Sequence, residues 1–281
     1  MVKQKLGKIL SILIVVGLVV VSMVAISQAQ QKDYESILEK VQKTGVLTVG
    51  VPTSQRWSVK DIKTGEWEGI SIDIMDNLAN SMENVKVQYK EVGWDTFPIE
   101  LKNGTIDIFA GTAHYTVPRA ERVAFPHPVF WKGIGCICKQ GEGDKYETYK
   151  ALNDPNVKVA VGIGTYEDHM AEVYFPQANL QRMKSGAHSD LAQAVRAGQA
   201  DLACFGHLNA YIFGEMELDW AEVAVPPFAP STQSFPVRQG DIKWFNFINA
   251  YFRDVIDSGF VRELVAQRFP NMPEEIRWVK P

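Results

Sequence analysis

The chain has 281 residues, of which 46% are hydrophobic and 22% charged, and its formal net charge at pH 7 is -4. These values are ordinary for globular proteins, and the length allows one large domain or two of modest size. Because the sequence has no basic tract, it excludes nucleic acid and anionic membrane surfaces as expected partners.

The first thirty residues have the pattern of an export signal. Three lysines fall within the first eight residues, residues 9–26 are apolar and uncharged, and Ser27 and Ala29 form a small-x-small cleavage site. We therefore predict a signal peptide over residues 1–29. An uncleaved membrane anchor is the alternative, because the apolar run is long enough to span a bilayer. No cysteine lies near the cleavage site, which argues against a lipid anchor.

The next part of the chain alternates between helical and strand patterns. Apolar spacing predicts helices over residues 33–44, 72–82 and 94–101, strands over 46–51, 85–90 and 105–109, and a hairpin turn over 60–66. Such alternation is typical of a parallel sheet, in which binding sites lie at the carboxyl ends of the strands.

The same rhythm restarts further along the chain. We predict strands over residues 131–139, 157–161, 180–183 and 202–205, helices over 165–175, 189–197, 207–216, 241–258 and 260–269, and breaks at 140–144 and 226–230. Two α/β units separated by two breaks indicate two lobes between which the chain crosses twice. We expect residues 33–134 and 227–281 in one lobe and residues 135–226 in the other.

The cysteines and histidines indicate neither a disulfide framework nor a metal site. The three cysteines are Cys136, Cys138 and Cys204. The first two lie two residues apart on a predicted strand, a spacing at which cysteines rarely bridge, so we expect small buried apolar residues. The five histidines are scattered without metal-ligand spacing.

One stretch, residues 110–125, combines the features of an anion site. A buried strand runs into Gly111 and Thr112 and leaves backbone N–H groups free at its end. Thr116 can cap a short helix, and Arg119 lies one turn in, near those N–H groups. A guanidinium can bind both oxygens of a carboxylate, which favours a carboxylate site. The alternative is a surface helix whose Arg119 pairs with Glu121 or solvent.

Three short motifs follow one another around this stretch. Gly104 and Asp107 precede two hydrophobic residues and a small one, Thr116 and Arg119 are three apart, and an aromatic and proline segment covers residues 125–130. This series resembles the binding loop of periplasmic solute-binding proteins that serve polar amino-acid ABC transporters. The resemblance extends, in order, over about residues 33–270, through further family-like segments at 46–51, 69–73 and 159–165.

The resemblance implies an α/β, two-lobed hinged periplasmic-binding-protein fold. Each lobe would be a mostly parallel sheet flanked by helices, two crossover segments would join the lobes, and hinge bending would bury the ligand between them. The implied function is that of a monomeric periplasmic receptor, which binds a small carboxylate-bearing ligand, an amino acid or a related compound, and delivers it to an ABC permease. The resemblance implies no enzymatic activity, catalytic residue, metal or cofactor.

The resemblance also implies a set of ligand-binding residues. Arg119 corresponds to the carboxylate-binding arginine, and the helix start at Thr165 offers free N–H groups that favour anions. Aromatic members of the set could instead be core residues. The residues implied are Arg56, Trp57, Trp94, Thr112, His114, Arg119, Thr165, Tyr166, Gly206 and His207.

Gly206 departs from the family pattern. Family members usually have an aspartate there, which pairs with the α-ammonium of the ligand, and a buried ammonium without a carboxylate is costly. Three explanations remain open. The ammonium stays near water, another acid such as Glu167 or Asp190 reaches in, or the ligand is not an α-amino acid. His207, Asn209 and Arg56 would suit a more anionic or amide-bearing ligand.

Two other function classes share the predicted fold. Exported cyclohexadienyl dehydratases carry a glutamate as general acid, and the corresponding position here is Asn209, which cannot usefully donate a proton at neutral pH. A sensor ectodomain would need a membrane anchor, and only an uncleaved N-terminal segment could supply one.

Overall fold

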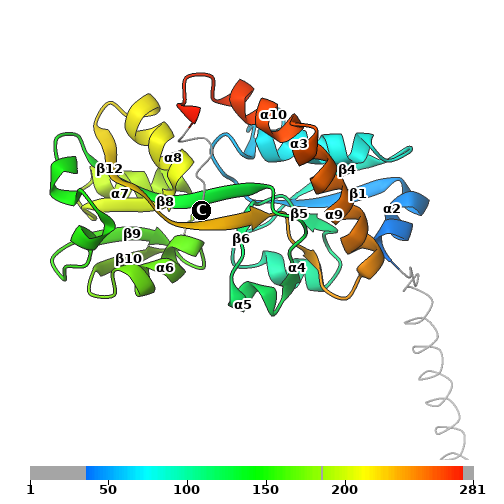
Figure 1. Ribbon diagram of the computed structural model, residues 1–281, viewed down its shortest axis with the longest axis horizontal. Coiled ribbons are helices and arrows are strands. Elements are labelled where there is room, and N and C mark those ends of the chain that lie inside the picture. Colours follow the sequence, from blue (N-terminus) through cyan, green and yellow to red (C-terminus); the bar gives the residue numbers. More distant parts are fainter. Residues whose placement is uncertain (1–35, 185, 275–281) are drawn as a thin grey trace, which may run out of the picture. The chain divides into compact units, whose positions relative to one another are not determined.

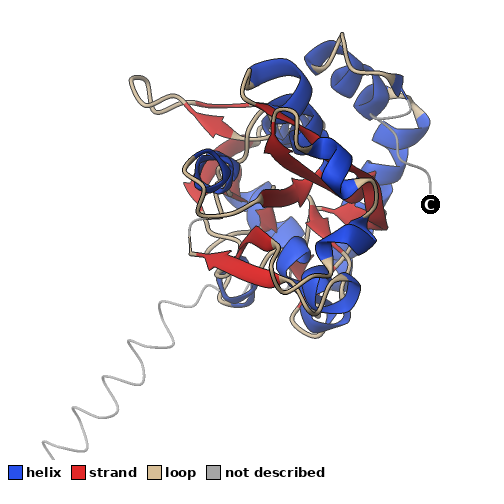
Figure 2. Ribbon diagram, turned by 90° about the vertical axis from the view of Figure 1, so that its left-hand side faces the viewer, coloured by secondary structure: helices blue, strands red, loops and turns tan. Residues whose placement is uncertain are grey.

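The computed structural model describes residues 36–184 and 186–274 (Figure 1). The predicted signal peptide, residues 1–29, lies outside these ranges. Within them, no helix is long and apolar enough to cross a membrane. The chain forms two main sheets, and Figure 2 shows helices packed around the strands.

The first sheet has the strand order β4-β1-β5-β13-β7. Its strands are β1 (Val46–Val51), β4 (Lys86–Glu91), β5 (Ile108–Phe109), β7 (Val123–Ala124) and β13 (Val237–Arg238). The strands β4, β1 and β5 are parallel, whereas β13 pairs antiparallel with β5 and β7. The late strand β13 therefore lies between strands that come more than a hundred residues earlier in the chain.

The second sheet has the strand order β10-β9-β11-β8-β12-β6. Its strands are β6 (Ala113–His114), β8 (Phe130–Lys139), β9 (Lys158–Gly162), β10 (Asn179–Met183), β11 (Leu202–Gly206) and β12 (Ala221–Ser234). The strands β10, β9 and β11 are parallel, and β8, β12 and β6 add to them antiparallel. A separate hairpin pairs β2 (Val59–Lys60) with β3 (Trp67–Glu68), which confirms the predicted turn between them.

The helices alternate with the strands, as the sequence predicts. They are α2 (Ile37–Thr44), α3 (Ile70–Asn80), α4 (Phe97–Lys102), α5 (Val117–Ala120), α6 (Tyr166–Tyr174), α7 (His188–Arg196), α8 (His207–Tyr211), α9 (Ile242–Asp257) and α10 (Phe260–Arg268). Short 3-10 turns cover η1 (Gly143–Tyr146) and η2 (Tyr149–Leu152), and a π-helical segment η3 (Ile212–Glu217) extends α8.

One buried aspartate joins the starts of two helices. Asp241 caps α9 by accepting the N–H of Trp244, and its other oxygen accepts the N–H of Ile37 at the start of α2. The Ser36 hydroxyl also donates to Asp241. Burial alone would raise the pKa of Asp241, but these hydrogen bonds outweigh it and the pKa is lowered. The long-range contact explains how α9, at the far end of the chain, is fixed beside α2.

The predicted proline-rich break at residues 226–230 is wrong, because these residues belong to the long strand β12. The pairing of β12 with β8 shifts register between Val225 and Phe228 and again between Phe228 and Ser231. Proline has no N–H to donate, and such bulges let a strand pass through it. The predicted lobe boundaries at 134/135 and 226/227 fall within β8 and β12, which lie side by side (Figure 1).

The prediction that the cysteines form no disulfide is also wrong. Cys136 on β8 and Cys204 on β11 are direct cross-strand partners and form a disulfide. The neighbouring pair, Cys136 and Cys138, does not bridge, as its spacing predicts. Cys138 is a buried free thiol, and burial raises its pKa to about 12. The sequence analysis missed the bridge because strand pairing over 68 residues is not visible in local spacing.

Candidate functional site

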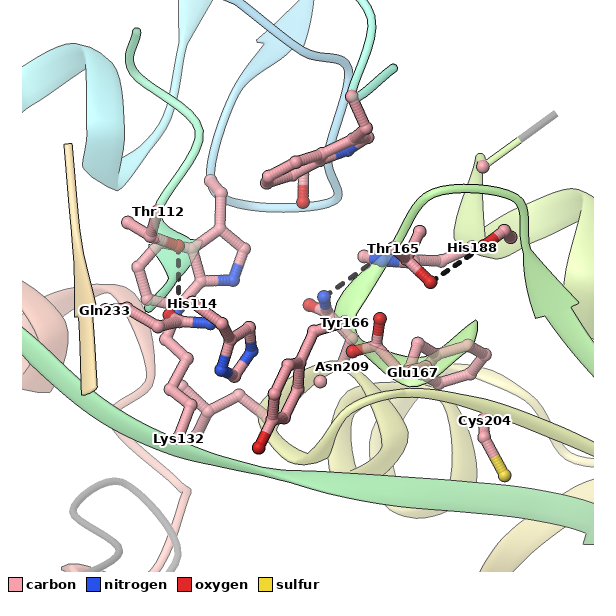
Figure 3. Close-up of a pocket in the computed structure, with 18 of the residues that line it drawn as sticks. Thr112, His114, Lys132, Thr165, Tyr166, Glu167, His188, Cys204, Asn209 and Gln233 are labelled. Atoms are coloured by element: carbon pink, nitrogen blue, oxygen red, sulfur yellow. Dashed lines mark hydrogen bonds between the residues drawn. The ribbon is translucent and has the colours of Figure 1, made fainter. Parts of the chain in front are cut away.

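A pocket lies where side chains from both sheets meet. The empty space between these side chains is about 640 Å³ when the open solvent at its mouth is included, and about 60 Å³ of it can hold the centre of a water molecule. Loops after β1, β4, β5, β9 and β10 supply part of its lining, and the rest comes from β6, β8, β11 and β12 and from the helices α5, α6, α7 and α8. Figure 3 shows His114, Tyr166, Glu167 and Asn209 around a common space.

Most of the predicted binding residues line this pocket. Those that do are Trp57, Trp94, Thr112, His114, Arg119, Thr165, Tyr166 and Gly206. Arg56 and His207 are not among the lining residues. Arg56 forms a salt bridge of 2.8 Å with Glu217, and Nδ1 of His207 lies 3.1 Å from the backbone nitrogen of Gly133.

Arg119 is positioned by the short helix α5. As predicted, Thr116 caps this helix, because its hydroxyl accepts the backbone N–H of Arg119. The guanidinium donates to the carbonyl of His114 at 3.3 Å and to that of Gly164 at 3.1 Å, so it reaches from α5 to the loop after β9. It forms no ion pair with Glu121 within the described residues. Burial lowers the pKa of Arg119, and the nearby charge of Glu167 partly offsets this.

A stacked pair of rings forms one wall of the pocket. The rings of His114 and Tyr166 lie 3.9 Å apart at an angle of 10°. His114 Nδ1 lies 2.9 Å from the Ser231 hydroxyl, and the Tyr166 hydroxyl donates to the carbonyl of Ala229. Burial lowers the pKa of His114 well below its usual value, and the charge of Arg119 adds to this effect. His114 is therefore neutral near pH 7 and serves as a flat polar surface.

Lys132 is a pocket residue that the sequence analysis missed. It lies on β8 with a residue exposure of only 5%, and its Nζ donates to the Thr112 hydroxyl at 3.2 Å. The ammonium also lies over the Trp57 ring, 3.1 Å from its centroid. Burial lowers the pKa of Lys132 well below its usual value, against the charge of Glu167. A lysine within the apolar run Trp131–Cys138 was the available signal, since strands rarely bury an unpaired lysine.

Of the two acids considered as substitutes for an aspartate at position 206, only Glu167 lines the pocket. It lies in the first turn of α6 and is 9% exposed. Burial raises its pKa, while hydrogen bonds and the charges of Arg119 and Lys132 lower it. Figure 3 shows its carboxylate among the side chains that face the pocket.

Three further polar side chains, His188, Asn209 and Gln233, line the pocket. Asn209 Nδ2 lies 3.0 Å from Nδ1 of His188, and burial lowers the pKa of His188 to about 4, so its ring accepts this hydrogen bond. The side-chain oxygens of Asn209 and Gln233 are buried without a hydrogen-bond partner among the described residues. Buried polar atoms usually have partners, so these two acceptors indicate a place for donors from a ligand. The sequence analysis missed His188 and Gln233.

Neither the pocket nor the rest of the described chain gathers a metal site. Within residues 36–184 and 186–274, no three His, Cys, Asp or Glu side chains are grouped so that they could hold a metal ion. The polar groups of the pocket are instead suited to direct hydrogen bonds with an organic ligand.

Comparison with known proteins identifies the family. Residues 47–271 match the model of the bacterial extracellular solute-binding proteins, family 3. The chain is 24% identical over 251 residues to the ABC transporter glutamine-binding protein GlnH of Bacillus subtilis (strain 168), covering 88% of this chain and 90% of GlnH. It is 22% identical to the cyclohexadienyl dehydratase of Pseudomonas aeruginosa, with 85% and 88% coverage.

A solved structure agrees with this assignment. The crystal structure of the ancestral amino acid-binding protein AncCDT-1, a precursor of cyclohexadienyl dehydratase, superposes with a TM-score of 0.75 at 28% identity, over 83% of this chain and 100% of that one. The chain therefore belongs to the family-3 extracellular solute-binding proteins and has their two-lobed α/β fold.

Proposed function

We propose that this family-3 solute-binding protein is a monomeric periplasmic receptor that closes on a small amino acid or related carboxylate-bearing solute and delivers it to an ABC permease. The observation that carries the proposal is the position of Arg119. Its guanidinium faces the pocket and already spans from α5 to the loop after β9. A carboxylate placed there can accept two parallel hydrogen bonds from one side chain.

The two lobes of this receptor would be residues 33–134 with 227–281, and residues 135–226. A carboxylate held by Arg119 and by the N-terminal turn of α6 would contact both lobes at once. Such a ligand has a higher affinity for the closed arrangement and shifts the population toward it. Trp57 and Trp94 line the pocket and provide an intrinsic fluorescence probe of this change.

The closure is tested by adding ligand while measuring tryptophan fluorescence and small-angle scattering. We expect a saturable fluorescence change and a smaller radius of gyration. An unchanged radius with a ligand shown to be bound would contradict closure.

An enzymatic role is less well supported by the pocket. Asn209 stands at the position of the glutamate that would act as general acid in the dehydratases, and its amide nitrogen faces His188. An amide group cannot transfer a proton to a substrate as a general acid at neutral pH. A dehydratase assay with a cyclohexadienyl substrate should therefore show no turnover above an Arg119→Ala control, and measurable turnover would favour the enzyme.

Export and release from the membrane are tested by mass spectrometry of the periplasmic fraction. The intact mass should lack about the first thirty residues, the usual length of a signal peptide. Recovery of only the full-length chain from the membrane pellet would favour the sensor ectodomain instead.

A further inference from the structure

The pocket contains three charged side chains that do not pair with one another. Arg119, Lys132 and Glu167 all line it, yet none forms a salt bridge within 4.0 Å in the part of the chain that the structure describes. The hydrogen bonds of the two cations go to neutral groups, two backbone carbonyls for Arg119 and the Thr112 hydroxyl for Lys132. The pocket thus offers two positive groups and one negative group to a ligand.

The Lys132 ammonium has more N–H donors than it has acceptors in the part of the chain that the structure describes. An ammonium has three N–H donors, and among the described residues its one hydrogen bond is to Thr112. Its other near neighbours are the rings of Trp57 and Phe130, with centroids at 3.1 and 4.8 Å. Aromatic faces attract a cation, but they do not replace the hydrogen bonds of an anion at a buried site. An acidic group of the ligand at Lys132 would supply both the charge and the missing acceptors.

The pocket also has acceptors for a positively charged group of the ligand. Gly206 provides no carboxylate, and the described residues around the pocket offer Glu167 as the acid that faces it. The partnerless oxygens of Asn209 and Gln233 are acceptors in the same pocket. A ligand ammonium, which has donors and no acceptor, would satisfy a carboxylate and such oxygens together.

We infer that the ligand is an acidic amino acid, with its α-carboxylate on Arg119, its second acidic group on Lys132 and its ammonium on Glu167. This inference rests on the proposed function and specifies the ligand class of the same pocket. A ligand with two negative groups and one positive group complements the two cations and one carboxylate of the protein. Amides and hydrocarbon side chains would leave the Lys132 ammonium without an anion.

The first test removes the second negative charge of the ligand, by replacing glutamate with glutamine, and the positive charge of the protein, by replacing Lys132 with methionine. Calorimetry compares L-glutamate with L-glutamine, which have the same shape, on the wild-type protein and on Lys132→Met. The wild type should bind glutamate more tightly, and Lys132→Met should weaken glutamate by roughly 30-fold or more. The variant should change glutamine by less than about threefold, a small effect on this scale. L-Aspartate, tested in parallel, shows which spacing of the acidic groups fits better.

The second test addresses Glu167. Glutarate has both carboxylates of glutamate and lacks the ammonium. Glu167→Gln should weaken glutamate by roughly tenfold or more and leave glutarate unchanged or bound more tightly, since it removes a repelling charge. Equal losses for both ligands would overturn the assignment of the ammonium to Glu167.

Lys139→Met is the matched control. Lys139 lies on the same strand, is exposed, and does not line the pocket, so its replacement should leave both affinities unchanged. Circular dichroism and thermal unfolding establish that each variant is folded, and Lys132→Gln provides a second, polar replacement at the same position.

The outcomes separate this inference from the proposed function. If glutamine or another neutral amino acid binds more tightly than glutamate, and Lys132→Met affects both equally, the acidic ligand is wrong while the amino-acid receptor stands. If neither an amino acid nor another small carboxylate-bearing solute binds the folded wild-type protein, the proposed function itself fails.

Discussion

Replacing Arg119 by alanine tests the carboxylate site most sharply. The half-buried guanidinium lies at the junction of α5 and the loop after β9, where it donates to two carbonyls. Truncating one partner of a buried charge pair costs about 2–5 kcal/mol. Because Arg119 is partly exposed, we expect the low end of this range, about 2 kcal/mol, which is roughly a 30-fold loss of affinity.

The fold should survive this replacement. The cap of α5 uses the backbone N–H of Arg119, which alanine keeps, and the Thr116 hydroxyl that accepts it is unchanged. Arg119→Lys should lose nearly as much affinity, because an ammonium cannot form the paired hydrogen bonds of a guanidinium. Arg122→Ala is the matched control, since Arg122 is exposed and lies outside the pocket.

The assay is calorimetric titration of each variant with the ligand that binds the wild type, alongside circular dichroism. Affinity of Arg119→Ala within about threefold of the wild type, with the fold intact, would refute the carboxylate site.

Three further predictions follow from the structure. Gly206→Asp should leave glutamate affinity unchanged or raise it, because a Cβ at this position meets no atom within 4 Å and we expect the ligand ammonium nearby on Glu167; a collapse of glutamate affinity in calorimetry would contradict that place for the ammonium. The Cys136–Cys204 disulfide closes a separation of 68 residues, so its reduction should lower the free energy of unfolding by about 4 kcal/mol in the chain-entropy model. Thiol titration of the unfolded protein should count one free thiol before reduction and three after. Three free thiols before reduction would contradict the bridge. Burial lowers the pKa of His188 to about 4 in the folded protein, against about 6.5 when unfolded, so the unfolding free energy should fall as pH drops from about 6.5 toward 4. Denaturant unfolding at several pH values should show a smaller fall for His188→Gln than for the wild type. An equal fall in both would show that His188 does not cause it.

The sequence predicted best those features that depend on neighbouring residues. The strand at residues 46–51 and the Thr116 cap of α5 are as predicted, because apolar runs and capping hydroxyls act over a few residues. The family motifs then placed Arg119 at the pocket, although no single motif was specific enough alone.

The missed features depend on contacts between distant segments. The disulfide joins β8 to β11, and Lys132 meets Thr112 across 20 residues. His188 and Asn209 face each other from two different helices. Local spacing carries no information on such pairs, and the bulges that let β12 continue through its prolines depend on its pairing with β8.

Arg56 and His207 illustrate the same limit. Each lies next to a residue that lines the pocket, yet Arg56 forms a salt bridge with Glu217 and His207 faces the backbone of Gly133. A position in a motif fixes the backbone location of a residue, but the direction of its side chain depends on the neighbours it finds in the folded protein.

The central claim is that the pocket holds an amino acid through Arg119. Native mass spectrometry of wild-type protein and Arg119→Ala, both purified without denaturation, tests it most directly. The claim predicts a bound species on the wild type, with the mass of an acidic amino acid once it is released, and its absence on the folded variant. A bound species that lacks a carboxylate, or one retained equally by Arg119→Ala, would contradict the claim.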